Sequence, residues 1–192
     1  MQFYFVICKL NVGYFAGWGN LVYFDTEEYQ IPNTGTMMLA QIPKLGSQWR
    51  IIHDFKPTEY LQAADPAFGL CVFTGDRKTP GNSFLLTYFH FPKISLGLCI
   101  RDDNNQSQQA QPAVTSTQLP NVGEWTRIEI GHEKVDEKYF LSLSIGGREV
   151  VRKEVTDPEL RKLTDVEIVI GHSHEECRQP GFIRRLVVLE KR

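Results

Sequence analysis

The chain has 192 residues, of which 42% are hydrophobic and 23% are charged. This length and composition predict one domain, residues 1–192, with a sizeable core. The 21 basic and 23 acidic residues are spread along the chain with a net charge of −2, so no nucleic-acid partner is expected. No apolar run approaches the roughly 18 to 20 residues of a membrane helix, so no membrane insertion is expected either.

The first ten residues, "MQFYFVICKL", are apolar but are interrupted by Lys9. They lack a charged leading region and a small-residue cleavage site, which favours a strand over a signal peptide. The four cysteines, Cys8, Cys71, Cys99 and Cys177, show no CxxC spacing and leave the redox compartment open. Cys71 and Cys99 are read either as small buried hydrophobes or as a cross-strand disulfide.

Short runs of β-branched and aromatic residues, separated by Gly, Pro, Asn or Asp, recur along the whole chain. This pattern predicts an all-β protein. The strands expected in chain order are 2–9, 21–24, 36–41, 48–55, 69–74, 83–91, 94–101, 125–131, 139–145, 149–155, 166–170 and 182–190.

The connections between these strands include one clear turn. Gly146-Gly147 in "SIGGREV" separates two strands and predicts a tight hairpin, because both glycines can adopt positive φ. Residues 157–163, "DPELRKL", predict one or two helical turns, with Asp157 as the cap. Residues 102–118 have too few apolar side chains to pack and are expected to form a flexible loop.

Six motifs follow one another between Gln48 and Leu189: "WRIIHDFKPT", "FGLCVFTGD", "GNSFLLTYFHFPKISLGLCI", "GEWTRIEI", "LSLSIGGREV" and "VEIVIGHSHEECRQPGFIRRLVVL". The order of these segments resembles the laminin G-like domains, which belong with the pentraxins to the concanavalin A-like jelly rolls. Residues 1–47 have no clear counterpart in this family. The resemblance implies a jelly-roll β-sandwich of two antiparallel sheets. It also implies non-catalytic recognition of a glycan or a protein partner, in an extracellular setting, with a cytoplasmic one as the alternative.

Calcium is the one cofactor for which the residues supply ligands. Asp102, Asp103 and Asn104 offer hard oxygen ligands on a polar loop, and members of the resembled family bind calcium at the sandwich rim with Asp and Asn. A flexible acidic loop without metal is favoured over this calcium site. Asp76, which ends "FTGD", is a second rim candidate, although Gly-Asp is also an ordinary turn.

Two aromatic residues in loop-like contexts are candidates for stacking on a sugar. Trp18 lies in the glycine-flanked "AGWGN", and Tyr60 lies in "KPTEYLQ". Aromatic rings at such positions either contact a ligand or pack against the protein itself. Trp49 and Trp125 begin predicted strands, and packing in the core or at the rim is expected for both.

The segment "GHSHEECRQPG" has the residue types of a zinc site in His172, His174 and Cys177. A closed structural site needs four ligands, and no fourth is evident, so the segment is interpreted as a loop between two strands. The acidic stretch "HEKVDEKY" lies between two predicted strands and is interpreted as a hairpin tip, with Lys134 and Lys138 offsetting its charge.

The sequence contains no nucleophile elbow, P-loop or dinucleotide fingerprint, so a binding module is favoured over an enzyme. A glycan-active hydrolase or lyase on the same scaffold is one alternative. A structural domain that self-associates into a homo-oligomer is another.

Overall fold

The computed structural model describes residues 17–23, 27–33, 35–61, 67–73, 83–90, 93–98, 111–155, 163–172 and 179–192. Within these residues the secondary structure consists of β-strands. The strands are β1 (Trp18–Tyr23), β2 (Tyr29–Gln30), β3 (Gly35–Leu45), β4 (Trp49–Pro57), β5 (Ala67–Phe73), β6 (Ser83–His90), β7 (Lys93–Leu98), β8 (Gln111–Ser116), β9 (Thr126–Val135), β10 (Lys138–Ile145), β11 (Arg148–Glu154), β12 (Leu163–His172) and β13 (Gly181–Lys191).

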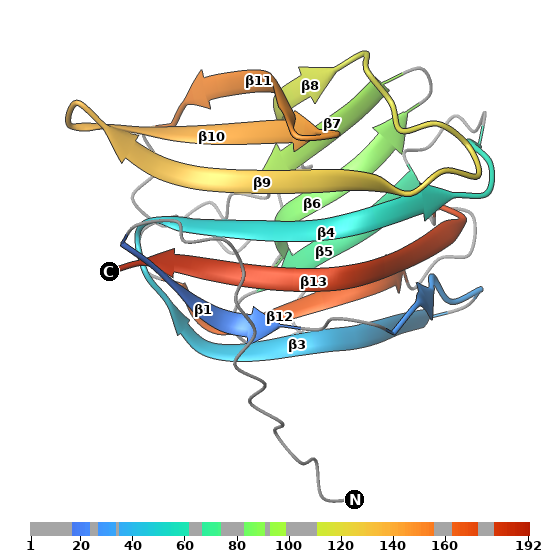
Figure 1. Cartoon of the computed structure of the whole chain (residues 1–192), viewed down its shortest axis with the longest axis horizontal. Coiled ribbons are helices and arrows are strands. Elements are labelled where there is room, and N and C mark those ends of the chain that lie inside the picture. Colours follow the sequence, from blue (N-terminus) through green and yellow to red (C-terminus); the bar gives the residue numbers. More distant parts are fainter. Residues whose placement is uncertain are drawn as a thin grey trace, which may run out of the picture.

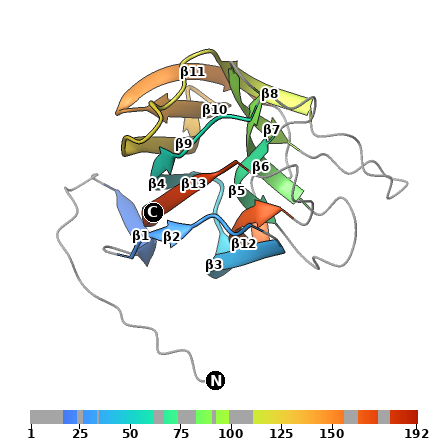
Figure 2. The same cartoon turned by 90° about the vertical axis from the view of Figure 1, so that its right-hand side faces the viewer.

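The strands form two antiparallel sheets that face each other (Figures 1 and 2). Sheet A has the order β1-β13-β4-β9-β10-β11, with β2 also paired to β13. Sheet B has the order β3-β12-β5-β6-β7-β8. Sheet A is the front layer in Figure 1, so its outer face is turned toward the viewer. The predicted all-β sandwich of two antiparallel sheets is confirmed.

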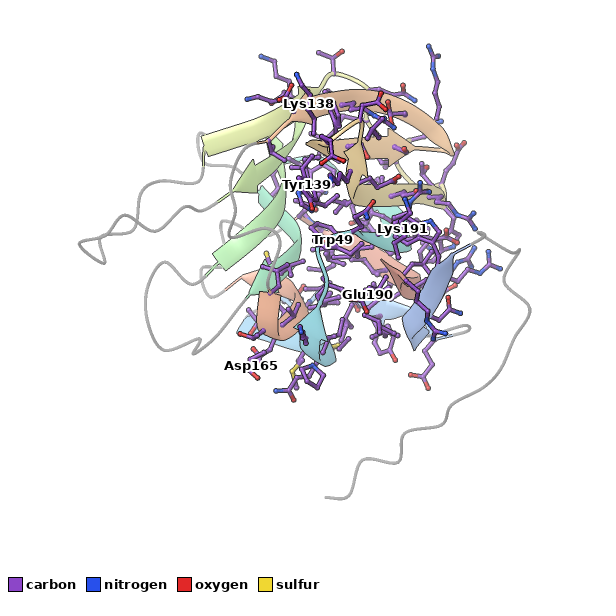
Figure 3. The ribbon with its side chains drawn as sticks, turned by 90° about the vertical axis from the view of Figure 1, so that its left-hand side faces the viewer. Trp49, Lys138, Tyr139, Asp165, Glu190 and Lys191 are labelled. Carbon is purple, nitrogen blue, oxygen red and sulfur yellow. The ribbon has the colours of Figure 1, made fainter. Side chains whose placement is uncertain are left out.

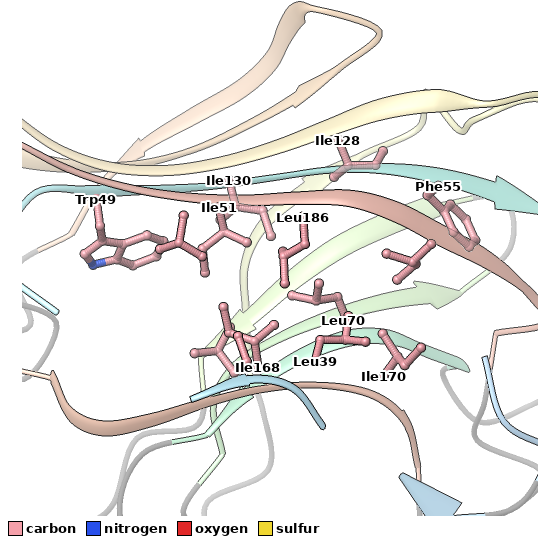
Figure 4. Packing of buried hydrophobic residues seen from close by; sticks show 14 of the residues in the cluster. Leu39, Trp49, Ile51, Phe55, Leu70, Ile128, Ile130, Ile168, Ile170 and Leu186 are labelled. Atoms are coloured by element: carbon pink, nitrogen blue, oxygen red, sulfur yellow. The ribbon is translucent and has the colours of Figure 1, made fainter. Parts of the chain in front are cut away.

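The core lies between the two sheets, because alternate residues of each strand point inward. Figure 4 shows Trp49, Ile51 and Phe55 of β4 facing aliphatic side chains of sheet B, including Leu70 and Ile168. Leu141, Leu143 and Ile145 of β10 are at most 2% exposed, whereas Ser142 and Ser144 between them are half-buried. The alternation of aliphatic residues and serines in this stretch of the sequence therefore matches the alternation of buried and half-buried side chains.

Two local predictions can be compared with the strands directly. Gly146 and Gly147 form the turn between β10 and β11 with φ of 63° and 81°, which confirms the predicted hairpin. The prediction of an irregular loop over 102–118 is wrong for residues 111–116, which form β8 and pair with β7. Residues 111–116 form a strand because their backbone pairs with β7. Local composition does not predict this long-range pairing.

Other predicted elements fall outside the described residues. These include the strand at 2–9 and, apart from Leu163, the helical turns at 157–163; Leu163 itself is the first residue of β12. In the part of the chain that the structure describes, no helix is long and apolar enough to cross a membrane.

Candidate functional site

Two adjoining rows of polar and aromatic residues cross the outer face of sheet A where β4 lies between β9 and β13. Ile51 and Phe55 of β4 point into the core, so Asp54 and Lys56 point outward. Asp54 is opposite Arg127 of β9 and Arg184 of β13, and Lys56 is opposite Phe182 of β13. Trp125 directly precedes β9, whose first residue Thr126 is opposite Phe55, so Trp125 lies beside Lys56. With Arg185, these residues form what we call the arginine–tryptophan cluster: Asp54, Lys56, Trp125, Arg127, Phe182, Arg184 and Arg185.

A β-bulge in β13 brings two consecutive arginines to the same carboxylate. The register with β4 shifts between Arg184 and Val187, and Arg185 has a φ of 53°. Arg184 Nε and Arg185 Nη1 donate to Asp54 Oδ2 over 3.5 Å and 3.3 Å. In a regular strand these two side chains would point to opposite faces of the sheet. The bulge therefore doubles the arginines available on the outer face.

The cluster has more cationic than anionic groups. The side chain of Asp54 is only 9% exposed, whereas those of Arg127 and Arg185 are 57% and 51% exposed. Arg127 Nε lies 3.9 Å from Asp54 Oδ1, beyond hydrogen-bond distance, and Arg184 Nη1 also donates to Glu28 Oε1 over 3.4 Å. Four cations thus accompany the two carboxylates, and the exposure of Arg127 and Arg185 leaves part of their guanidinium donors accessible to solvent.

The aromatic rings of the cluster contact these cations. The guanidinium carbon of Arg184 lies 4.0 Å from the centre of the Trp125 ring. Lys56 Nζ lies 4.7 Å from the Trp125 ring and 4.8 Å from the Phe182 ring. Such cation–π contacts hold the long side chains in place, and both rings stay half-buried at the surface. The arrangement places hydrogen-bond donors over and beside two partly exposed aromatic rings.

A second charged group lies toward the other end of β4. Arg50 pairs with Glu129 at 2.8 Å and with Glu133 at 2.6 Å, and its guanidinium lies 4.9 Å from the ring of Trp18. Glu129 and Glu133 are four residues apart on β9, and both are half-buried. Here one guanidinium group engages both, which makes them an ion-pair network of the sheet.

Behind this second group lies a buried aromatic stack. The His132 ring stacks on Trp49 at 5.6 Å and on Tyr139 at 5.2 Å, and His132 Nδ1 lies 2.9 Å from the Ser47 carbonyl oxygen. Figure 3 labels Trp49 and Tyr139 at this end of the sandwich, with Glu190 and Lys191 at the end of β13. His132 and Trp49 are both completely buried, so the stack belongs to the core.

The structure does not bring together Trp18 and Tyr60, the two aromatic residues that the sequence singles out. Trp18 is half-buried opposite Lys191, near the start of β4, whereas Tyr60 follows the end of β4. The Tyr60 hydroxyl donates to the Pro120 carbonyl oxygen over 2.6 Å, and its ring lies 5.8 Å from that of Phe89. Burial raises the pKa of Tyr60 above its ordinary value. Both residues make contacts within the protein, and their role in ligand binding stays a prediction.

The remaining predicted site residues fall outside the described residues. These are Asp76, Asp102, Asp103 and Asn104, together with His174 and Cys177 of the zinc candidate. His172 is the last residue of β12. Among the described residues, no group of three or more His, Cys, Asp or Glu side chains is arranged to hold a metal ion.

Sequence reasoning missed the arginine–tryptophan cluster. The sequence predicts packing for Trp125 and places Arg184-Arg185 within the last strand, 182–190. The available signal was the doublet itself: two adjacent arginines in an apolar strand put one cation on the wrong face unless a bulge intervenes.

No protein-family model matches the chain, and no curated protein matches it. Solved structures do. The carbohydrate recognition domain of Emp47p has a TM-score of 0.58 and 12% identity, over 91% of this chain and 88% of that one. The binding domain of botulinum neurotoxin serotype D has a TM-score of 0.60 and 14% identity over 88% of this chain, which spans only 40% of that structure.

A pentraxin from Limulus polyphemus that forms a native heptamer has a TM-score of 0.55 and 14% identity, over 86% of this chain and 73% of that one. Identities this low concern the fold, not the ligand. The strand order, the antiparallel pairing and these similarities agree with the resemblance seen in the sequence. The chain has the jelly-roll β-sandwich fold of these solved structures.

Proposed function

We propose that the chain is a non-catalytic recognition module that binds a glycan, or a glycosylated or protein partner, through the outer surface of its sandwich. The observation that carries this proposal is the arginine–tryptophan cluster, where two half-buried rings adjoin four cations on the outer face of sheet A. Apolar ring faces suit the C–H faces of sugars, and directed N–H donors suit their oxygens. Similarly folded structures include a carbohydrate recognition domain and a toxin binding domain, which supports the same class of function.

A glycan array followed by titration with the best-bound sugar tests this function. Trp125→Ala and Trp18→Ala form a matched pair, because both tryptophans are half-buried on sheet A and each lies beside an arginine. Loss of one stacking ring costs about 1 to 1.5 kcal/mol, or about tenfold in affinity. We expect this loss for Trp125→Ala and less than about a twofold change for Trp18→Ala.

A tenfold loss confined to Trp18→Ala would instead locate the ligand at the opposite end of β4. An array on which the folded wild-type protein binds no glycan, together with no protein captured at micromolar affinity, would refute the recognition function. Turnover of an oligosaccharide, seen as released reducing ends, would favour the hydrolase or lyase alternative.

Calcium dependence stays a separate proposal, based on Asp102, Asp103 and Asn104. A ligand that binds only the folded state at one hundred times its Kd stabilises that state by about 2.7 kcal/mol. We therefore expect calcium to raise the melting temperature of the wild-type protein, and Asp102→Ala with Asp103→Ala to abolish the rise. No shift in the wild-type protein would remove calcium from the proposal.

A further inference from the structure

We infer that the ligand of the arginine–tryptophan cluster is an acidic oligosaccharide, whose carboxylate or sulfate group is bound by Arg127 and Arg185. This inference rests on the proposed recognition function and assigns it a chemical class of ligand. It also assigns the ligand to the outer face of sheet A, at the end where β4 finishes and β13 begins.

The backbone of β13 supports this assignment. Arg185 has a φ of 53°, a left-handed conformation that is unfavourable for a residue with a side chain relative to extended backbone. This conformation directs the Arg185 guanidinium to the same carboxylate as that of Arg184. A strained bulge that brings two arginines to the same face of a sheet does not favour folding by itself. Backbone strain of this kind is typical of binding sites.

The charge distribution supports an anionic ligand. The chain as a whole has a net charge of −2, yet four cations meet here, and among the described residues their ion pairs are with Asp54 and Glu28. Asp54 is largely buried and forms ion pairs with the arginines. The side chains of Arg127 and Arg185 are more than half exposed. A planar guanidinium with donors to spare recognises carboxylate or sulfate oxygens in pairs, which a lysine does not.

The aromatic row explains why a sugar is preferred to an acidic peptide. Trp125 and Phe182 lie two residues along their strands from Arg127 and Arg184, so the two rows are about 7 Å apart. A sugar ring packed on one of these aromatic side chains would bring an acidic substituent within reach of the guanidinium groups. An acidic peptide would use the charges but not the ring surfaces.

The experiment compares defined oligosaccharides by isothermal titration calorimetry with the full chain. The probes are sulfated dextran oligosaccharides, oligogalacturonate, unsulfated dextran oligosaccharides and a poly-glutamate peptide of similar charge. We expect the wild-type protein to bind one or both acidic sugars, to bind unsulfated dextran at least about tenfold more weakly, and to lose affinity as salt rises.

Arg127→Gln with Arg185→Gln should lower affinity for the acidic sugar at least about tenfold, because charge-assisted contacts of two guanidinium groups are lost. The matched control is Arg148→Gln with Arg152→Gln, which removes two exposed arginines from β11 of the same sheet and should change affinity less than about twofold. Arg185→Gly is a second variant, since glycine tolerates this φ and removes the side chain without disturbing the bulge.

Equal loss in the two double variants would overturn the inference, since binding would then follow overall charge. Equal or tighter binding of poly-glutamate would overturn it in favour of an acidic protein partner. Binding of unsulfated dextran alone would overturn it but leave glycan recognition intact. Binding of none of the probes, with no glycan bound on the array, would refute both the inference and the proposed glycan function.

Discussion

His53 is a buried ionisable residue whose protonation opposes folding. It lies on the inward face of β4, is 2% exposed, and its Nδ1 has no hydrogen-bond partner. Burial lowers the pKa of His53 to about 4, and the neighbouring charge of Asp54 offsets only part of this effect. The folded protein therefore keeps His53 neutral at a pH where the unfolded chain, with an ordinary pKa near 6.5, already binds a proton.

This difference predicts an acid-sensitive stability. Above about pH 6.5, His53 is neutral in both the folded and the unfolded state and does not reduce the free energy of unfolding. As the pH falls toward 4, protonation of the unfolded chain lowers this free energy, on the order of 3 kcal/mol in total. Urea unfolding of the wild-type protein should show this decline. His53→Leu should show a shallower one over the same range. If the two free energies of unfolding fall in parallel with pH, the burial of a neutral histidine is not the cause.

At the scale of elements, the two hairpins at the ends of β10 use the same kind of turn with different residues. Gly146 and Gly147 form one turn with φ of 63° and 81°. Asp136 and Glu137 form the other with φ of 47° and 66°, and the ion pairs of Lys134 with Glu137 and of Lys138 with Glu154 flank it. The predicted hairpin tip at "HEKVDEKY" is confirmed for Asp136 and Glu137, whereas Glu133 belongs to β9.

This comparison predicts opposite effects of two reciprocal substitutions. Gly147→Ala introduces a side chain at positive φ and should lower the free energy of unfolding by about 1 kcal/mol. Glu137→Gly removes a side chain at positive φ and should raise it by up to about 1 kcal/mol, less the small contribution of the exposed ion pair with Lys134. Urea unfolding measures both changes, and an equal sign for the two would contradict the assigned turn geometry.

At the scale of the whole molecule, stability depends on the apolar layer between the sheets. Ile130 of β9 is completely buried in that layer, whereas Val135 of the same strand is 39% exposed. Ile130→Ala should lower the free energy of unfolding by about 2 to 5 kcal/mol through lost burial and a residual cavity. Val135→Ala is the matched control and should cost less than about 1 kcal/mol. Similar costs for the two would mean that β9 does not face the core as described.

The local pattern of the chain was enough to determine the fold class, the Gly146-Gly147 hairpin and the inward face of β10. Each depends on residues close together in the sequence: alternation with a period of two selects the buried face, and turn residues with positive φ end the strands. Residues 111–116, Gln-Pro-Ala-Val-Thr-Ser, have neither signal, so the sequence does not predict β8 although its backbone pairs with β7.

The arginine–tryptophan cluster depended on tertiary structure. Trp125, Asp54 and Arg184 are far apart in the sequence and meet only because β4 pairs with both β9 and β13. Local composition does not encode which strands become neighbours, because that order results from long-range pairing and burial across the whole sandwich. The bulge at Arg185 is likewise a property of the paired strands, since an isolated alternating pattern would have placed the two arginines on opposite faces.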